Sequence, residues 1–338
     1  MTSAVSTMNA SDTDCPLFPD KPEHCDVLIA IRQTTGTLSL VGCTFMIAVI
    51  WLFKKYAAFS QRLILYLSIG ALLNSISYLM GGLRPDGPLC DFQAWWMTFF
   101  DWTVLLWVCC ITFNLYLNVI KMITKESFEW AYHVLCWGLP LLLSCLPFIG
   151  NHYGPAGAWC WIEDNWHWRV GIWYGPLFLT IFCLFVVYIY ITYILTRKAS
   201  SWQGTYDPDT EHHKELMKED IKPLRAYPCI YLAVSIFPLI NRIQNAVSPE
   251  NPVFPLMVLS ALSSPLQGAV NAIVFGLDRE TFSRLTPSQI KMAFLSHHQA
   301  PRVREYPVAL YSQDTPSSPL NADSPQPRFS NVSYSRLT

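Results

Sequence analysis

Long apolar stretches alternate with short polar segments along most of the chain. Each stretch approaches or exceeds the ~20 residues that cross a bilayer as a helix. Seven spans are predicted, at 28–53, 63–82, 91–120, 130–150, 169–196, 224–247 and 254–277. Because a spanning segment in lipid must satisfy its own backbone hydrogen bonds, the pattern predicts an all-α membrane protein, a bundle of seven transmembrane helices.

The composition agrees with a membrane protein and excludes several functions. Of the 338 residues, 52% are hydrophobic and 14% are charged, whereas soluble domains carry about 25% charged residues. A net charge of −1 offers no basic surface for nucleic acid. His133 is the only histidine within a predicted span, and span 254–277 lacks the lysine that a retinal Schiff base needs. We therefore expect no nucleic-acid partner, no metal, no cofactor and no enzymatic activity.

Charged residues in the loops orient the predicted bundle. The first 27 residues contain one basic residue, Lys21, against five acidic residues. Basic residues gather in the loops after the first, third and fifth spans, while the alternate loops carry only Arg84 and Arg169. The positive-inside rule places the N-terminus outside and the C-terminus in the cytosol. Residues 1–27 are then an extracellular segment, in which Asn9 begins a glycosylation sequon.

Cysteines follow the same division between the two sides of the membrane. Of the eleven cysteines, Cys15, Cys25, Cys90 and Cys160 lie in predicted outer loops, where the compartment is oxidising. Four cysteines allow three pairings. We favour Cys15–Cys25, which closes a short local loop, together with Cys90–Cys160, which would hold the loop between the fourth and fifth spans across the mouth of the bundle.

Two ionisable residues, Asp101 and Arg242, lie at membrane depth, where a charge is costly and usually faces the bundle interior. Asp101 is about 16 Å deeper than Cys90 along one helix, on nearly the same face. Arg242 is about 7–8 Å inside the outer end of the sixth span, beside Asn241 and Asn245. A guanidinium with neighbouring amides suits a phosphate or carboxylate ligand. Alternatively, Asp101 and Arg242 pair with each other and only stabilise the bundle.

The remaining polar and aromatic residues of the spans are assigned structural roles. Four amides are predicted to form hydrogen bonds between helices, namely Asn74, Asn114, Gln267 and Asn271. Most of the thirteen tryptophans are predicted to form an interfacial belt, including Trp95, Trp96, Trp102, Trp159, Trp166, Trp168 and Trp173. Trp161, adjacent to Cys160, is the tryptophan that we place over the mouth of a ligand pocket.

Two segments follow the last span. Residues 278–298 mix apolar and basic residues and predict an amphipathic helix on the membrane surface, which Pro287 would kink or divide. Residues 299–338 are rich in serine and proline and predict a disordered cytosolic tail. Thr315, Ser318 and Ser324 each precede a proline, so the tail either accepts proline-directed phosphate or is an inert solvated segment.

Several blocks of residues carry a family resemblance. They are Lys125-Glu126-Ser127-Phe128-Glu129, Leu135-Cys136-Trp137-Gly138-Leu139-Pro140, Trp159-Cys160-Trp161-Ile162, Tyr174-Gly175-Pro176-Leu177-Phe178 and Asn241-Arg242-Ile243 with Asn245. In this order they resemble the cyclic-AMP-receptor family of G-protein-coupled receptors, typified by slime-mould chemoattractant receptors. The similarity covers all seven spans and neither tail. The chain lacks the Asp/Glu-Arg-Tyr and Asn-Pro-x-x-Tyr motifs of rhodopsin-type receptors.

The resemblance implies a multi-pass plasma-membrane receptor and supports the Cys90–Cys160 bridge. It implies two partners, a heterotrimeric G protein and a small extracellular ligand, which is cyclic AMP or another metabolite. Membrane lipid and an arrestin-type protein that binds the tail are further expected partners. Pro223, Pro228 and Pro238 weaken the sixth span and favour it as the moving helix. Its movement would open a groove between residues 121–129 and 197–225. A transporter or scaffold with the same bundle is the alternative.

Overall fold

The computed structural model describes residue 18 and residues 21–82, 85–121, 126–156, 158–163, 166–201, 224–248 and 251–298. The predicted Cys15, the glycosylation site Asn9, the hinge residue Pro223 and the tail sites Thr315, Ser318 and Ser324 lie outside these residues. The predicted groove at 121–129 and 197–225 lies partly outside them.

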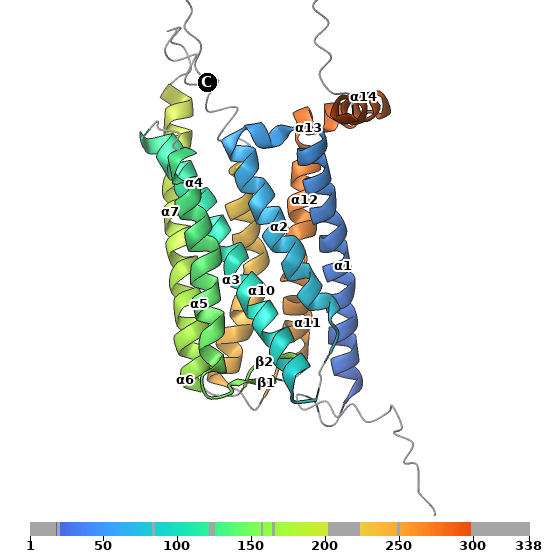
Figure 1. Cartoon of the computed structure of the whole chain (residues 1–338). Helices are drawn as coiled ribbons and strands as arrows, with labels where there is room; N and C mark the ends of the chain where they lie inside the picture. Colours follow the sequence, from blue (N-terminus) through green and yellow to red (C-terminus); the bar gives the residue numbers. More distant parts are fainter. Residues whose placement is uncertain are drawn as a thin grey trace, which may run out of the picture. The chain divides into compact units, whose positions relative to one another are not determined.

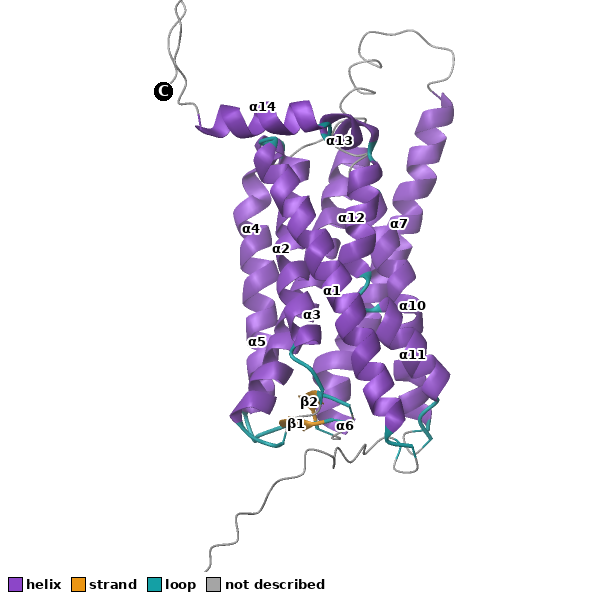
Figure 2. Cartoon of the chain, turned by 90° about the vertical axis from the view of Figure 1, so that its right-hand side faces the viewer, coloured by secondary structure: helices purple, strands orange, loops and turns teal. Residues whose placement is uncertain are grey.

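Within the described residues the chain is a bundle of long helices (Figures 1 and 2). The first three spans are α1 (Glu23–Leu52), α2 (Phe59–Leu79) and α3 (Pro88–Tyr116). The fourth joins α4 (Glu129–His133) and α5 (Leu139–Cys145), and the fifth joins α6 (Trp166–Trp168) and α7 (Gly175–Ser201). The sixth is α10 (Ala226–Val247), followed by α11 (Phe254–Ser263) and α12 (Gln267–Leu277).

Short helical turns complete or join the spans. Three are π-helical, at Leu117–Lys121, Val134–Gly138 and Arg169–Tyr174. Three are 3-10 turns, at Lys55–Ala57, Glu126–Phe128 and Leu146–Phe148. Among the described residues, six helices are long and apolar enough to cross a membrane, and α11 with α12 makes a seventh if the bent pair is counted as one span. The helical membrane bundle predicted from hydropathy is therefore present.

The seventh span is broken, where the hydropathy pattern predicts one continuous stretch. Helices α11 and α12 meet at 43°, because Pro265 has no N–H for the carbonyl four residues earlier. Ser39 of α1 repairs the break, since its hydroxyl donates to the Pro265 carbonyl and accepts from the Ala269 N–H (3.1 Å). A side chain of α1 thus bridges the break.

Helices α1 and α12 pack closely at two glycines. A Cβ built on Gly268 would lie 2.6 Å from Sγ of Cys43, and one on Gly42 would lie 2.9 Å from Cβ of Ala272. Neither position has room for a side chain. Small residues that let backbones approach are the usual means of packing helices in lipid, where no hydrophobic force acts between them.

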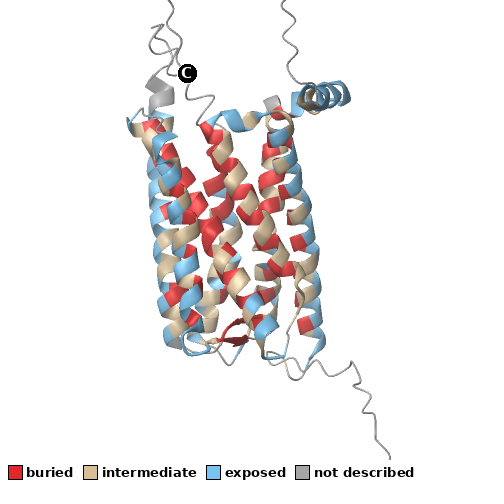
Figure 3. Ribbon diagram, viewed as in Figure 1, coloured by how far each residue is buried: buried red, intermediate tan, exposed pale blue. Residues whose placement is uncertain are grey.

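Burial shows which helices lie inside the bundle. Helix α3 is the most buried of the spans and α7 the least. Exposed residues lie along the outer faces and buried residues along the centre (Figure 3). Large apolar side chains of α7, such as Phe182, Phe185 and Tyr193, are exposed, as expected for a surface that contacts lipid tails.

A β-hairpin lies at one end of the bundle, which we call the hairpin end (Figure 1). Strands β1 (Tyr153–Pro155) and β2 (Cys160–Ile162) pair antiparallel, with Gly154 opposite Trp161. Cys160 is bonded to Cys90 in the first turn of α3, with 5.3 Å between the two Cα atoms. The predicted Cys90–Cys160 bridge is present and ties the hairpin to the central helix.

Two short helices lie at the opposite end, which we call the α14 end (Figure 2). The segment predicted as an amphipathic helix that Pro287 would kink or divide is divided, into α13 (Arg279–Arg284) and α14 (Pro287–His298), since Pro287 starts a new helix. Lys55 Nζ donates to Thr281 Oγ1 (2.7 Å). The His297 ring stacks on Trp51 and places Nε2 3.0 Å from the Leu52 carbonyl at the end of α1.

Candidate functional site

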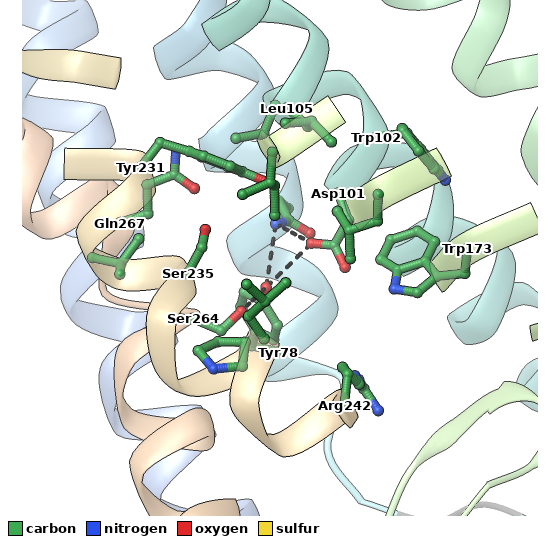
Figure 4. Close-up of a pocket in the computed structure, with 17 residues that line it drawn as sticks. Tyr78, Asp101, Trp102, Leu105, Trp173, Tyr231, Ser235, Arg242, Ser264 and Gln267 are labelled. Atoms are coloured by element: carbon green, nitrogen blue, oxygen red, sulfur yellow. Dashed lines mark hydrogen bonds between the residues drawn. The ribbon is translucent and has the colours of Figure 1, made fainter. Parts of the chain in front are cut away.

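A cavity of about 110 Å³ with both polar and apolar lining residues lies between the helices (Figure 4). Its lining comes from α2, α3, α7, α10 and the region where α11 meets α12. The lining polar residues are Asn74, Tyr78, Asp101, Tyr231, Ser235, Arg242, Ser264 and Gln267. Both ionisable residues predicted from the sequence, Asp101 and Arg242, therefore face one space.

Asp101 is held by α2 through one of its two carboxylate oxygens. Oδ1 accepts from Nδ2 of Asn74 (2.7 Å) and from the hydroxyl of Tyr78 (3.3 Å). The Tyr78 hydroxyl also lies 3.5 Å from Oγ of Ser264. Asn74 therefore forms the interhelical hydrogen bond predicted for it, and the network connects α2 and α3 to the break in the seventh span.

Arg242 lies under the hairpin. Its guanidinium carbon is 4.8 Å from the ring centre of Trp161 and 5.9 Å from that of Tyr174. These contacts stabilise a cation through the electron-rich ring face. Among the described residues no carboxylate lies within 4.0 Å of Arg242. Arg242 and Asp101 do not form the direct ion pair that was one of the two predicted alternatives, although they interact electrostatically.

A third charged residue, Arg32 of α1, belongs to the same cluster and was missed in the sequence. Its guanidinium carbon is 3.7 Å from the ring centre of Trp159 and 4.9 Å from that of Tyr78. Arg32 interacts electrostatically with Asp101 and Arg242. The sequence could have identified Arg32 by its position in the first predicted span, because an arginine within a span is unusual there for the same reason as at Arg242.

The hairpin holds both arginines through neighbouring tryptophans. Trp159 stacks on Arg32 and Trp161 on Arg242, while Cys160 between them is bonded to α3. Trp161 also meets Trp173 edge-on, with ring centres 5.6 Å apart. The hairpin is thus attached to α1, α3 and α10, and Trp161 lies over Arg242 rather than in the wall of the cavity.

Three sequence-based assignments differ from the structure. Trp102 and Trp173 are buried and line the cavity, so they do not belong to the interfacial belt. Gln267 also lines the cavity, and its Nε2 has no hydrogen-bond partner among the described residues, so this nitrogen does not form the predicted interhelical bond. Neither Asn241 nor Asn245 lines the cavity. Hydropathy could not separate these cases because it does not report which face of a helix points inward.

The outer cysteines of the N-terminal segment are partly described. Cys25 at the start of α1 is disulfide-bonded. Its predicted partner Cys15 lies outside the described residues, so the Cys15–Cys25 pairing stays a prediction.

A second charged cluster lies toward the α14 end, between α2 and α4. Arg62 Nε donates to Oε1 of Glu129 (3.0 Å), which also accepts from the Tyr66 hydroxyl (2.7 Å). A further guanidinium nitrogen of Arg62 is 3.5 Å from Glu126. The sequence does not predict this cluster, because Glu129 is more than 60 residues from both Arg62 and Tyr66 in the chain.

The helical bundle and its apolar spans define a multi-pass membrane protein, with a disulfide-tethered hairpin at one end and a cavity between the helices. The sequence model described as "Slime mold cyclic AMP receptor" matches residues 21–298. The chain therefore belongs to the slime mold cyclic AMP receptor family, in agreement with the resemblance found in its sequence.

Individual relatives extend beyond slime moulds. The chain is 29% identical over 275 residues to Cyclic AMP receptor-like protein A of Dictyostelium discoideum, covering 80% of this chain and 70% of that protein. It is 27% identical over 256 residues to G-protein coupled receptor 1 of Arabidopsis thaliana, covering 75% and 78%. It is 27% identical over 271 residues to G-protein coupled receptor 157 of Homo sapiens, covering 73% and 79%. The relatives are named as receptors and not as enzymes.

Proposed function

We propose that this protein is a plasma-membrane G-protein-coupled receptor whose hairpin end faces the cell exterior and binds a small anionic ligand. The observation that carries the proposal is Arg242, a guanidinium that lines a cavity without a carboxylate partner among the described residues. Two arginines and one aspartate interact in this region. An anion would balance the excess positive charge and form charge-assisted hydrogen bonds with Arg242.

The charges and the disulfide of the bundle support the proposed orientation. A disulfide persists on the oxidising side of the membrane, which supports an extracellular hairpin end. The basic loop residues Lys54, Lys55 and Lys121 lie toward the α14 end, as the positive-inside rule expects of cytosolic loops. A heterotrimeric G protein would then meet the α14 end, and α13 with α14 would lie on the inner membrane surface.

Signalling requires that ligand binding favours an active arrangement of the helices. A ligand that binds both arrangements equally shifts nothing, and changing a 1:99 ratio to 99:1 needs about 5.5 kcal/mol of differential binding. Helix α10 is suited to this role because Pro238 lies inside it and lines the cavity. Pro238 leaves the carbonyl of Val234 without its helical donor. Arg242 is one turn beyond Pro238, so ligand contact and hinge lie on the same helix.

The test is nucleotide exchange on a G protein in membranes from cells that express the full chain. Cyclic AMP, other cyclic nucleotides and a panel of anionic metabolites are the probes. We expect a saturable response that Arg242→Gln weakens at least tenfold, since a hydrogen bond to a charged group contributes about 1.5–3 kcal/mol. The matched control is Lys21→Gln, an exposed basic residue just before α1 and outside both the cavity and the predicted groove, which should keep full potency at equal surface expression.

Two results would contradict the proposal. Equal potency in the Arg242→Gln receptor would remove Arg242 from the ligand site. Flux of a labelled probe across the membrane, with no exchange at any concentration, would instead favour the transporter alternative.

A further inference from the structure

The cavity has a second polar region besides Arg242, centred on Asp101. Oδ1 of Asp101 receives both hydrogen bonds from α2, whereas Oδ2 has no hydrogen-bond partner among the described residues. Figure 4 shows the two dashed hydrogen bonds reaching one oxygen of the carboxylate. Because Asp101 lines the cavity, its second oxygen is available to a molecule inside. An ionised oxygen in this position accepts hydrogen bonds and donates none.

Gln267 supplies the complementary group. The side chain is 9% exposed and lines the cavity, and its Nε2 has no hydrogen-bond partner in the described part of the chain. An amide nitrogen left without an acceptor in a buried site costs about 1–3 kcal/mol. Gln267 is the first residue of α12, so this donor lies at the break in the seventh span.

These groups restrict the chemistry of a ligand more than Arg242 alone. A simple anion would pair with Arg242 but would leave Oδ2 of Asp101 without a donor and would be repelled by its charge. A bare cation would suit Asp101 but would leave both Arg242 and Nε2 of Gln267 unsatisfied. A molecule that satisfies all three must carry an anion for Arg242, a hydrogen-bond donor for Asp101 and an acceptor for Gln267, and among donors an ammonium group also balances the charge of Asp101.

We propose that the ligand is amphoteric. Its anionic group binds Arg242, an N–H or ammonium group donates a hydrogen bond to Oδ2 of Asp101, and an acceptor group accepts a hydrogen bond from Nε2 of Gln267. This inference rests on the proposed function, because it assigns the remaining groups of the same ligand site. It makes Asp101 and Gln267 specificity-determining residues. Arg242 then attracts anions in general, while Asp101 selects those that carry a donor.

The experiment compares probes in matched pairs that differ only in the nitrogen group. One pair is cyclic AMP and its analogue with hydrogen in place of the 6-amino group, and the other is L-glutamate and glutarate. Binding is measured on the purified full chain as thermal stabilisation against probe concentration. In at least one pair, the member that carries the nitrogen group should bind at least tenfold more tightly.

Variants then assign the preference to individual residues. Asp101→Asn keeps an oxygen for Asn74 and should reduce the preference within the pair to threefold or less. Gln267→Met should weaken binding of the preferred member at least fivefold. Asp91→Asn makes the same change on the same helix but outside the cavity, and should preserve the preference. Arg242→Gln should abolish binding of both members.

The outcomes separate the two proposals. Equal affinity within both pairs, or an unchanged preference in Asp101→Asn, would overturn the amphoteric ligand while leaving the anion site on Arg242 in place. If Asp101→Asn does not yield folded protein, unchanged binding in Gln267→Met overturns the inference. Absence of any binding that depends on Arg242 would overturn both proposals.

Discussion

The contact between α1 and α12 at Gly268 leads to a quantitative prediction. A Cβ at Gly268 would lie 2.6 Å from Sγ of Cys43, 3.1 Å from Cβ of Ser39 and 3.3 Å from the Ser39 carbonyl oxygen. Cys43 and Ser39 are both fully enclosed, so neither can move aside into open space. Gly268→Ala must therefore separate the helices or force a strained rotamer, at a cost of about 1–3 kcal/mol.

Gly138 provides the matched control for the same substitution. It has helical backbone angles (φ −73°, ψ −49°), and a Cβ there would meet no atom within 4 Å. Gly138→Ala should be neutral or stabilise by up to about 1 kcal/mol through helix propensity. The two variants should differ by about 1–4 kcal/mol, and a difference of about 2 kcal/mol corresponds to about 4–8 °C in apparent Tm.

The assay is thermal unfolding of the purified receptor in detergent, with the two alanine variants measured side by side. The double variant Cys43→Ala, Gly268→Ala removes the sulfur that the new methyl group meets and should recover at least half of the lost Tm. Equal stability of Gly268→Ala and Gly138→Ala would refute the close approach of α1 and α12. Failure of Cys43→Ala to rescue would refute Cys43 as its cause.

Two further predictions concern the ends of the bundle. Arg62 and Glu129 are each about four-fifths buried at their side chains (21% and 24% exposed). A double-mutant cycle with Gln at both positions, measured by thermal unfolding, should give a coupling free energy of about 1 kcal/mol. The same cycle on Arg62 and Glu126, whose side chain is 63% exposed, should give a smaller coupling. Equal coupling free energies for the two pairs would contradict the cluster. Cys160→Ser should detach the hairpin from α3, lower stability by about 2–5 kcal/mol and weaken agonist potency at least tenfold. The control is Cys145→Ser, at an exposed free cysteine, which should change neither stability nor agonist potency. Full agonist potency in Cys160→Ser would contradict a role of the hairpin in the site.

The sequence by itself determined the class of protein and the number of spans. Hydropathy is a local property, and ~20 apolar residues suffice to define a transmembrane helix whatever its neighbours are. For the same reason Asp101 and Arg242 could be recognised as unusual from the chain alone, because the cost of a charge in lipid does not depend on its partner. The Cys90–Cys160 bridge could be favoured because few outer cysteines compete for pairing.

Only the tertiary structure decided which polar residues share one space. Arg32, Tyr78 and Gln267 lie on three different spans, and the rotation of each helix about its axis places them near Asp101. That rotation is set by packing, such as the contact of Gly268 with Cys43, and hydropathy in lipid carries little information about it because both faces of a span are apolar. The break at Pro265 was visible as a proline, but the hydroxyl that bridges it comes from Ser39, 226 residues away.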